Sequence, residues 1–206
     1  MEEARVAMTT RRDRGNRLER SDWIRAATEV LAHEGKDAVR IENLAKKLRI
    51  SKGSFYWHFR DREDLLGAVL DAWESGHNEW NVEENEVHRD PAGRWAGLVE
   101  LLSRPSRARV DVAIFSWARE EEKVSRRVRE IERKRVAHLQ QVFREIGFTA
   151  QQAAEWSDAA MLVRLGWVDR VTRDAGFRES GPSLEEILSR FVLAASALAS
   201  QEALQQ

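Results

Sequence analysis

The sequence predicts an all-α protein, in which an N-terminal three-helix helix-turn-helix domain precedes a larger helical domain, with about nine helices in total. Apolar residues recur at three- and four-residue spacing almost everywhere after residue 21, which is the period of amphipathic helices. Alternation of β-branched residues is nearly absent, and the chain has only 3 prolines. A chain of 206 residues without cysteine must fold on its apolar core alone, without disulfides or cysteine-bound zinc.

Charge divides the chain into two parts. Residues 1–62 hold 15 Lys+Arg against 10 Asp+Glu, whereas the whole chain has a net charge of -1. A basic front on a slightly acidic chain is typical of a protein in which one part meets phosphate, although solvated surface alone explains an asymmetry of this size equally well. No window reaches the roughly 20 apolar residues of a membrane span, and the N-terminus has no signal-peptide core, so we expect a cytoplasmic protein without membrane contact.

The first helices fit a helix-turn-helix unit. We expect the first to open with Ser21 as N-cap and to end before Gly35. A short helix over residues 41–48, a tight turn, and a second short helix over residues 52–59 complete the unit. In the second short helix Phe55 and Phe59 face inward, and the residues between them are free to reach a major groove.

The remaining pattern predicts long helices and three domains of the chain. The helices cover residues 61–80, 91–103, 106–119, 121–146, 150–174 and 183–201, separated by a polar loop over 81–90, Pro105, Gly147 and the stretch 176–182. We therefore predict a flexible basic arm over 1–20, a helix-turn-helix domain over 21–62 and a helical regulatory and dimerisation domain over 63–206.

The run from Ser51 to Trp73, SKGSFYWHFRDREDLLGAVLDAW, resembles the recognition helix and following helix of the TetR family of repressors. The resemblance covers roughly residues 21–75. It implies that three N-terminal helices bind double-stranded operator DNA, and that a long fourth helix leads to an all-helical ligand-binding domain. It also implies that the last two long helices form a four-helix bundle with a second subunit. Repression is the usual mode of this family.

The resemblance also implies which residues contact DNA. Lys52, Gly53 and Ser54 correspond to base-edge positions, and lysine can donate to guanine O6 and N7. The backbone-contact candidates complete the predicted interface, which consists of Arg40, Ser51, Lys52, Gly53, Ser54, Tyr56, Trp57, His58, Arg60 and Arg62. For Trp57, packing on the first helix is the alternative to a DNA contact.

One residue departs from the family pattern. Arg49 stands in the turn where the family usually has glycine, and a non-glycine residue at positive φ costs on the order of 1 kcal/mol. The departure affects the expected pose of Lys52 and leaves the fold prediction unchanged.

The last two long helices carry apolar stripes with small residues between them, which predicts a homodimer interface. Ordinary packing within one subunit is the alternative. The predicted interface residues are Trp156, Ala160, Val163, Trp167, Leu184, Ile187, Leu188, Phe191, Ala195 and Leu198.

The chain has 8 tryptophans and 1 tyrosine, and most of the tryptophans follow residue 70. Large rings can line a cavity for a small apolar effector, although core packing accounts for each of them separately. The predicted pocket residues are Trp73, Trp95, Phe115, Trp117, Trp156, Met161 and Trp167.

The sequence leaves two rival functions. An enzyme has little support, because the five histidines are scattered, no cofactor motif is present, and a metal site at His77, Glu83, Glu84 and His88 is a weaker interpretation than polar loop surface. A DNA-binding dimer whose second domain is only a dimerisation or protein-interaction scaffold is the stronger rival. A C-terminal domain needs aromatic core residues with or without a pocket.

Overall fold

The computed structural model describes residues 18–78, residues 93, 95, 97 and 99, and residues 105–203. Within these residues all regular structure is helical, which confirms the predicted all-α class. The chain forms two compact units, Met1–Ala72 and Trp73–Gln206. The boundary falls inside a helix, ten residues beyond the predicted end of the helix-turn-helix domain. The predicted arm and the loop over 81–90 lie outside the described residues.

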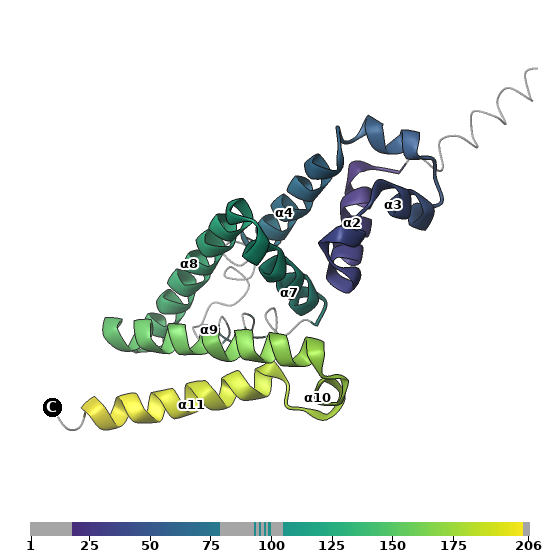
Figure 1. Ribbon diagram of the computed structural model, residues 1–206. Helices are drawn as coiled ribbons and strands as arrows, with labels where there is room; N and C mark the ends of the chain where they lie inside the picture. Colours follow the sequence, from purple (N-terminus) through teal and green to yellow (C-terminus); the bar gives the residue numbers. More distant parts are fainter. Residues whose placement is uncertain are drawn as a thin grey trace, which may run out of the picture. The chain divides into compact units, whose positions relative to one another are not determined.

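The first unit begins with α2 (Arg20–Glu34), coloured purple in Figure 1. Its N-cap is Glu19 rather than the predicted Ser21, because the Asp22 carboxylate accepts the backbone N–H of Glu19 at 2.8 Å and fixes the helix start two residues earlier. Gly35 ends the helix at φ 85°, as predicted. A short 3₁₀ helix, η1 (Lys36–Ala38), then leads into α3.

The helix-turn-helix pair consists of α3 (Ile41–Leu48) and η2 (Lys52–Trp57). The bounds of α3 confirm the prediction. The second element is a 3₁₀ helix that ends at Trp57 rather than an α-helix that extends to residue 59. Glycine and aromatic residues favour α-helix weakly, and so short a segment closes i→i+3 hydrogen bonds instead, such as Ser54 N to Ser51 O at 3.1 Å.

Arg49 occupies the turn between these elements in the left-handed region, at φ 58° and ψ 41°. Among the described residues it is the one non-glycine residue with positive φ. The turn that usually needs glycine therefore keeps its geometry with arginine, and Ile50 N donates to Ala45 O at 3.0 Å to close the helix end.

Helix α4 (Arg62–Asn78) belongs to both units. It starts where predicted, because the Asp61 carboxylate accepts the backbone N–H of Asp64 at 2.8 Å. Beyond it, residues 93, 95, 97 and 99 lie in helix, and the rest of the predicted helix over 91–103 lies outside the described residues.

The second unit consists of α7 (Pro105–Glu120), α8 (Glu122–Glu145), α9 (Ala150–Arg173), α10 (Ala175–Ser180) and α11 (Leu184–Ala203). Helices α7, α8 and α9 pack on one another, and α11 lies alongside α9 (Figure 1). Their apolar faces form one core, in which Trp95 packs on Phe143 with ring centroids 5.4 Å apart.

One predicted connection in this unit is wrong. Pro105 begins α7 one residue before the predicted start, which suits a residue without a backbone donor. The stretch over 176–182, predicted as a connection, begins with the short helix α10. The Asp174 carboxylate accepts Phe177 N at 3.0 Å and starts this helix despite the glycine at position 176.

Candidate functional site

Aromatic packing fixes the recognition element η2 to the rest of the first unit. Phe55 is fully buried and meets Trp23 of α2 edge to face, with ring centroids 5.2 Å apart. Phe59 stacks on Phe55 at 5.4 Å and is also buried. Both rings point inward as predicted, so the opposite face of η2 has a defined orientation before any ligand is present.

The outer face of η2 carries two exposed aromatic side chains. Tyr56 is 62% exposed and Trp57 is 80% exposed. The alternative in which Trp57 packs on the first helix is therefore wrong, because a ring packed there would lose most of its solvent contact. Lys52 and Gly53 are also exposed, and Ser54 is half-buried. The predicted base-contact residues thus lie in one short segment with an apolar surface beside them.

Lys52 is paired within the free protein. Its Nζ lies 2.7 Å from Glu42 Oε1 of α3, and both side chains are more than half exposed. The hydrogen bond and charge of Lys52 hold the pKa of Glu42 below its usual value. To donate to a base edge, Lys52 must either break its ion pair with Glu42 or use another of its three N–H groups.

The predicted phosphate contacts fall into two groups. Arg60 is largely exposed beside Asp64, and Ser51 and Arg40 are exposed as well, with Arg40 Nε donating to Asp37 O at 3.0 Å. His58 is half-buried, and its Nε2 lies 3.0 Å from Leu18 O at the start of the described chain. These side chains lie on or next to the recognition element.

Arg62 has a structural position that the sequence did not indicate. Its Nε donates to Val39 O and its Nη2 to Lys36 O, both at 2.7 Å. Its remaining Nη1 pairs with Glu63 at 3.0 Å. The guanidinium therefore joins the first turn of α4 to the segment before α3, and its predicted phosphate contact would have to use the part facing Glu63.

The predicted pocket residues are mostly inside the second unit. Trp73, Trp95, Trp117, Met161 and Trp167 are buried, while Phe115 and Trp156 are half-buried. Trp73 Nε1 donates to Asp111 Oδ1 at 2.7 Å, and Trp167 Nε1 donates to Pro182 O at 3.1 Å. These rings thus take part in core packing, and the two indole N–H groups have acceptors within the subunit.

The predicted dimer residues also divide by burial. Five are buried in the single subunit, and Trp156 of α9 packs edge to face on Phe191 of α11 with centroids 5.0 Å apart. The side chain of Leu198 lies outside what the structure describes. The five buried residues are Ala160, Trp167, Leu184, Leu188 and Ala195. Sequence reasoning missed Leu162 and Leu193, which are 69% and 71% exposed on these same two helices.

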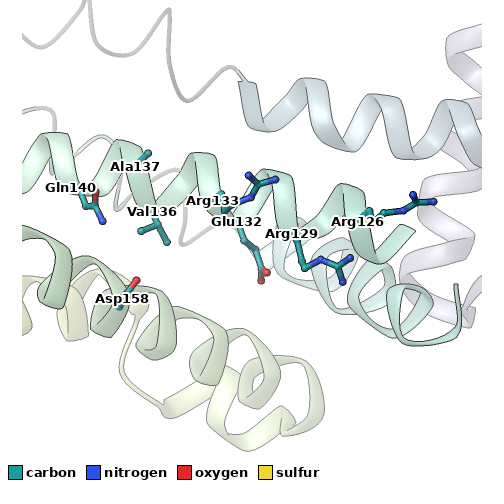
Figure 2. Close-up of a pocket in the computed structure, with 8 residues that line it drawn as sticks. All are labelled: Arg126, Arg129, Glu132, Arg133, Val136, Ala137, Gln140 and Asp158. Atoms are coloured by element: carbon teal, nitrogen blue, oxygen red, sulfur yellow. The ribbon is translucent and has the colours of Figure 1, made fainter. Parts of the chain in front are cut away.

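Sequence reasoning also missed a groove of about 750 Å³ on the surface of α8 and α9. Figure 2 shows Arg126, Arg129 and Arg133 along α8, with Asp158 contributed by α9. The three arginines follow helical spacing, which is the signal that could have indicated it. The groove is wide open to solvent, and Arg129 already pairs with Glu122 at 2.8 Å.

The described residues contain neither a metal-binding cluster nor a membrane-spanning helix. Over the described ranges, no three His, Cys, Asp or Glu side chains gather in a way that could hold a metal ion. Three residues of the alternative metal site lie outside those ranges, namely Glu83, Glu84 and His88. None of the helices within the described parts of the chain is both long and apolar enough to cross a membrane.

A tight turn joins α3 to η2, a buried aromatic ring fixes η2, and the outer face of η2 carries basic and aromatic residues. These features define the first unit as a helix-turn-helix domain. The sequence profile of the TetR family of bacterial regulatory proteins matches residues 24–69. Residues 24–69 therefore carry the N-terminal domain of the TetR family.

Individual relatives agree with this assignment. The chain is 32% identical over 75 residues to the class A tetracycline repressor protein from transposon 1721 of Escherichia coli, a match that covers 36% of this chain and 31% of that repressor. The chain thus matches only about a third of the length of the curated relatives found.

Solved structures resemble the chain over most of its length. A transcriptional regulator from Saccharomonospora viridis in complex with choline superposes with a TM-score of 0.70 at 20% identity, over 84% of this chain and 92% of that one. A TetR-family regulator from Streptomyces coelicolor superposes with a TM-score of 0.69 at 14% identity, over 95% of each chain. At these identities the likeness establishes the fold of both units.

Proposed function

We propose that the chain is a DNA-binding transcriptional regulator that recognises a palindromic operator as a homodimer. The observation that carries the proposal is the outer face of η2, where Tyr56 and Trp57 are exposed beside Lys52. Large rings are seldom left in water on a rigid element without a binding role, and these lie on the helix that reads the major groove in helix-turn-helix proteins.

Some residues of the proposed interface contact base edges, and others contact the phosphate backbone. Lys52 donates to a guanine edge, and the Trp57 ring contacts a thymine methyl or the sugar backbone. Tyr56, His58 and Arg60 hold phosphate oxygens and set the register. Glu42 holds Lys52 extended in the free protein and repels misplaced phosphate, which favours a geometry in which Lys52 alone approaches the base edge.

Two-fold pairing through α9 and α11 supports the palindromic operator. Among the described side chains of these two helices, Leu162 and Leu193 are the large apolar ones that remain exposed, and a dimer that covers both removes them from water. Two subunits present two recognition elements, and the resulting half-site spacing is set by the dimer.

Control by a small effector with an apolar body completes the proposal, with repression as the basal state and release on effector binding. A structural relative binds choline, which supports binding of small molecules within this fold. The effector acts by binding one of two subunit arrangements more tightly than the other. A second candidate, in which the second unit is only a dimerisation scaffold, is favoured by the burial of Trp73, Trp117 and Trp167 within one subunit.

The experiment selects operator sequences from random duplexes with the full-length protein and then footprints the winner. We expect a two-fold-symmetric footprint, specific Kd values of about 10⁻⁸ to 10⁻¹¹ M, and affinity that falls with salt. Lys52→Ala and Tyr56→Ala should abolish selection while the dimer persists. The matched control is Lys123→Ala, an exposed lysine of α8, which should leave the Kd unchanged. Failure to enrich any sequence would refute DNA recognition.

A further inference from the structure

Helices α4, α7, α8 and α9 bring charged side chains together inside the second unit. Asp111 of α7 is fully buried, and Arg135 of α8 and Arg164 of α9 are each 2% exposed. Trp73 of α4 donates its Nε1 to Asp111 Oδ1 at 2.7 Å. A buried charge is retained only where partners compensate its lost hydration, so this cluster demands an explanation beyond packing.

Asp111 forms ion pairs with both arginines. Arg164 Nη2 bonds directly to Oδ2, and Arg135 Nη2 lies 3.7 Å from Oδ1. The Arg135 guanidinium also stands over the Trp73 ring, 5.5 Å from its centroid. Burial lowers the pKa of Arg135 to about 10 against the opposing pull of Asp111, so the group is still protonated at neutral pH. The three side chains together carry one positive charge.

Arg164 has donors that the folded chain leaves unused. Within the described part of the chain, its Nε and Nη1 have no hydrogen-bond acceptor, and neither has the hydroxyl of the fully buried Ser157. Ser157 precedes Arg164 by two turns on the same face of α9, and helical side chains lean toward the N-terminus, so the Arg164 guanidinium extends toward the Ser157 end. Buried donors of this kind are rare in folded proteins.

We propose that Arg164, with Ser157 and the Asp111–Arg135 pair, forms the polar end of a binding site for a small organic monocarboxylate. The unused Nε and Nη1 lie on different edges of the guanidinium, so a carboxylate accepts from one of them and from the Ser157 hydroxyl, and its single negative charge balances the net charge of the three side chains. Met161, buried between Ser157 and Arg164 on the same face, supplies apolar contact for the body of the ligand. The inference that this carboxylate is the effector rests on the proposed function. The inference that the site binds a carboxylate does not depend on DNA recognition.

The first experiment introduces a carboxylate side chain into the proposed site in place of the ligand. Met161→Glu places a carboxylate three residues before Arg164 on the buried face, and Met161→Gln is its uncharged match in shape. We expect the Glu variant to melt about 3–5 °C above the Gln variant at pH 7. A Glu variant that is no more stable than the Gln variant would overturn the proposal.

The second arm uses the wild-type protein with acetate and benzoate, against acetamide, benzamide and sodium chloride at equal ionic strength. We expect the carboxylates alone to raise the Tm saturably by about 2 °C or more and to change tryptophan fluorescence through Trp73. The response should vanish in Met161→Glu, whose own carboxylate occupies the site, and persist in Lys123→Ala, which changes an exposed lysine of α8 outside the site. Equal shifts with the amides, or no carboxylate response, would also overturn the proposal.

Operator binding is then measured separately with and without benzoate. Stabilisation by carboxylates together with an unchanged operator Kd supports the site and contradicts only its role in control. Loss of the carboxylate response in a protein that still selects an operator overturns the site and leaves the proposed DNA recognition intact.

Discussion

Shortening Leu193 to alanine should weaken the proposed dimer strongly while leaving the subunit folded. Leu193 of α11 is 71% exposed, so its side chain contributes little to the core of a single subunit. The change removes three carbon atoms. Each buried carbon contributes about 0.8 kcal/mol, and we take the exposed fraction of the side chain as the part that dimerisation buries. Each subunit therefore loses about 1.5–2 kcal/mol of the free energy of dimerisation.

Two-fold symmetry doubles this loss, because one substitution appears on both sides of the interface. The dimer should therefore lose about 3–4 kcal/mol, and its Kd should rise by roughly 10² to 10³. Leu162→Ala, at the matching exposed position of α9, should have a similar effect. The residues buried between α9 and α11 are unsuitable for this test because their loss would unfold the subunit.

Sedimentation velocity over a concentration series measures the dimer Kd directly, and circular dichroism checks the helical content. Trp57→Ala is the matched control, since it also removes an exposed apolar side chain but from the other unit. It should leave the dimer Kd unchanged. A monomeric wild-type protein at tens of micromolar, or a Leu193→Ala dimer as tight as the wild type, would refute pairing through α9 and α11.

Three further changes test the interface and the core. Trp57→Ala should leave the Tm within about 1 °C, because the ring is exposed, yet cost operator binding about 1–3 kcal/mol, measured by fluorescence anisotropy with the selected duplex. Asp111→Asn should lower stability by about 3–5 kcal/mol in urea unfolding, since two buried guanidinium groups lose their carboxylate; a loss below 1 kcal/mol would show that the cluster is solvated. Burial lowers the pKa of His138 from its ordinary 6.5, so its neutral form is favoured in the folded state. Stability should therefore fall as the pH drops below 6.5, and His138→Gln should reduce that fall in Tm scans between pH 7.5 and 5.5.

The first unit could be predicted closely because its signals are local. Gly35 and Asp61 fix helix ends by their own backbone and side-chain hydrogen bonds, and the inward positions of Phe55 and Phe59 follow from helical spacing. The exposure of Trp57 could not be decided in this way. A ring of that size packs wherever a neighbouring helix offers space, and its surroundings depend on the angle between α2 and η2.

The charged cluster of the second unit escaped prediction for a different reason, although the sequence contained a signal. Arg135 occupies a place in the apolar stripe of α8 between Ile131 and Leu139. Arg164 likewise lies on the buried face of α9, and Asp111 follows Ala108 at the spacing of a core position. In a chain with 34 Lys+Arg, two arginines in these helices do not stand out from the solvated ones. A charge at a core-facing position of each of three consecutive long helices is the pattern that indicates a buried site.

Helix α4 offers a physical route from that cluster to DNA, and Trp73→Phe tests it. At one end of α4, Arg62 donates to Val39 O and Lys36 O in the first unit. Near the other end, Trp73 donates to Asp111, and Glu74 pairs with Arg127 in the second unit. We therefore expect a carboxylate that binds Arg164 beside Asp111 to act on the helix that holds the segment before α3.

Trp73→Phe removes the indole donor and keeps an aromatic ring over Arg135. We expect this variant to bind both operator and carboxylate, and to lose most of the 5- to 150-fold effect that a typical effector has on operator Kd. The two affinities are measured separately and then together in one anisotropy titration. An undiminished effect of the carboxylate on operator Kd would show that the coupling does not pass through the Trp73–Asp111 hydrogen bond. Loss of carboxylate binding itself would instead assign the indole to the binding site, because a residue that only transmits the change leaves the carboxylate Kd unaltered.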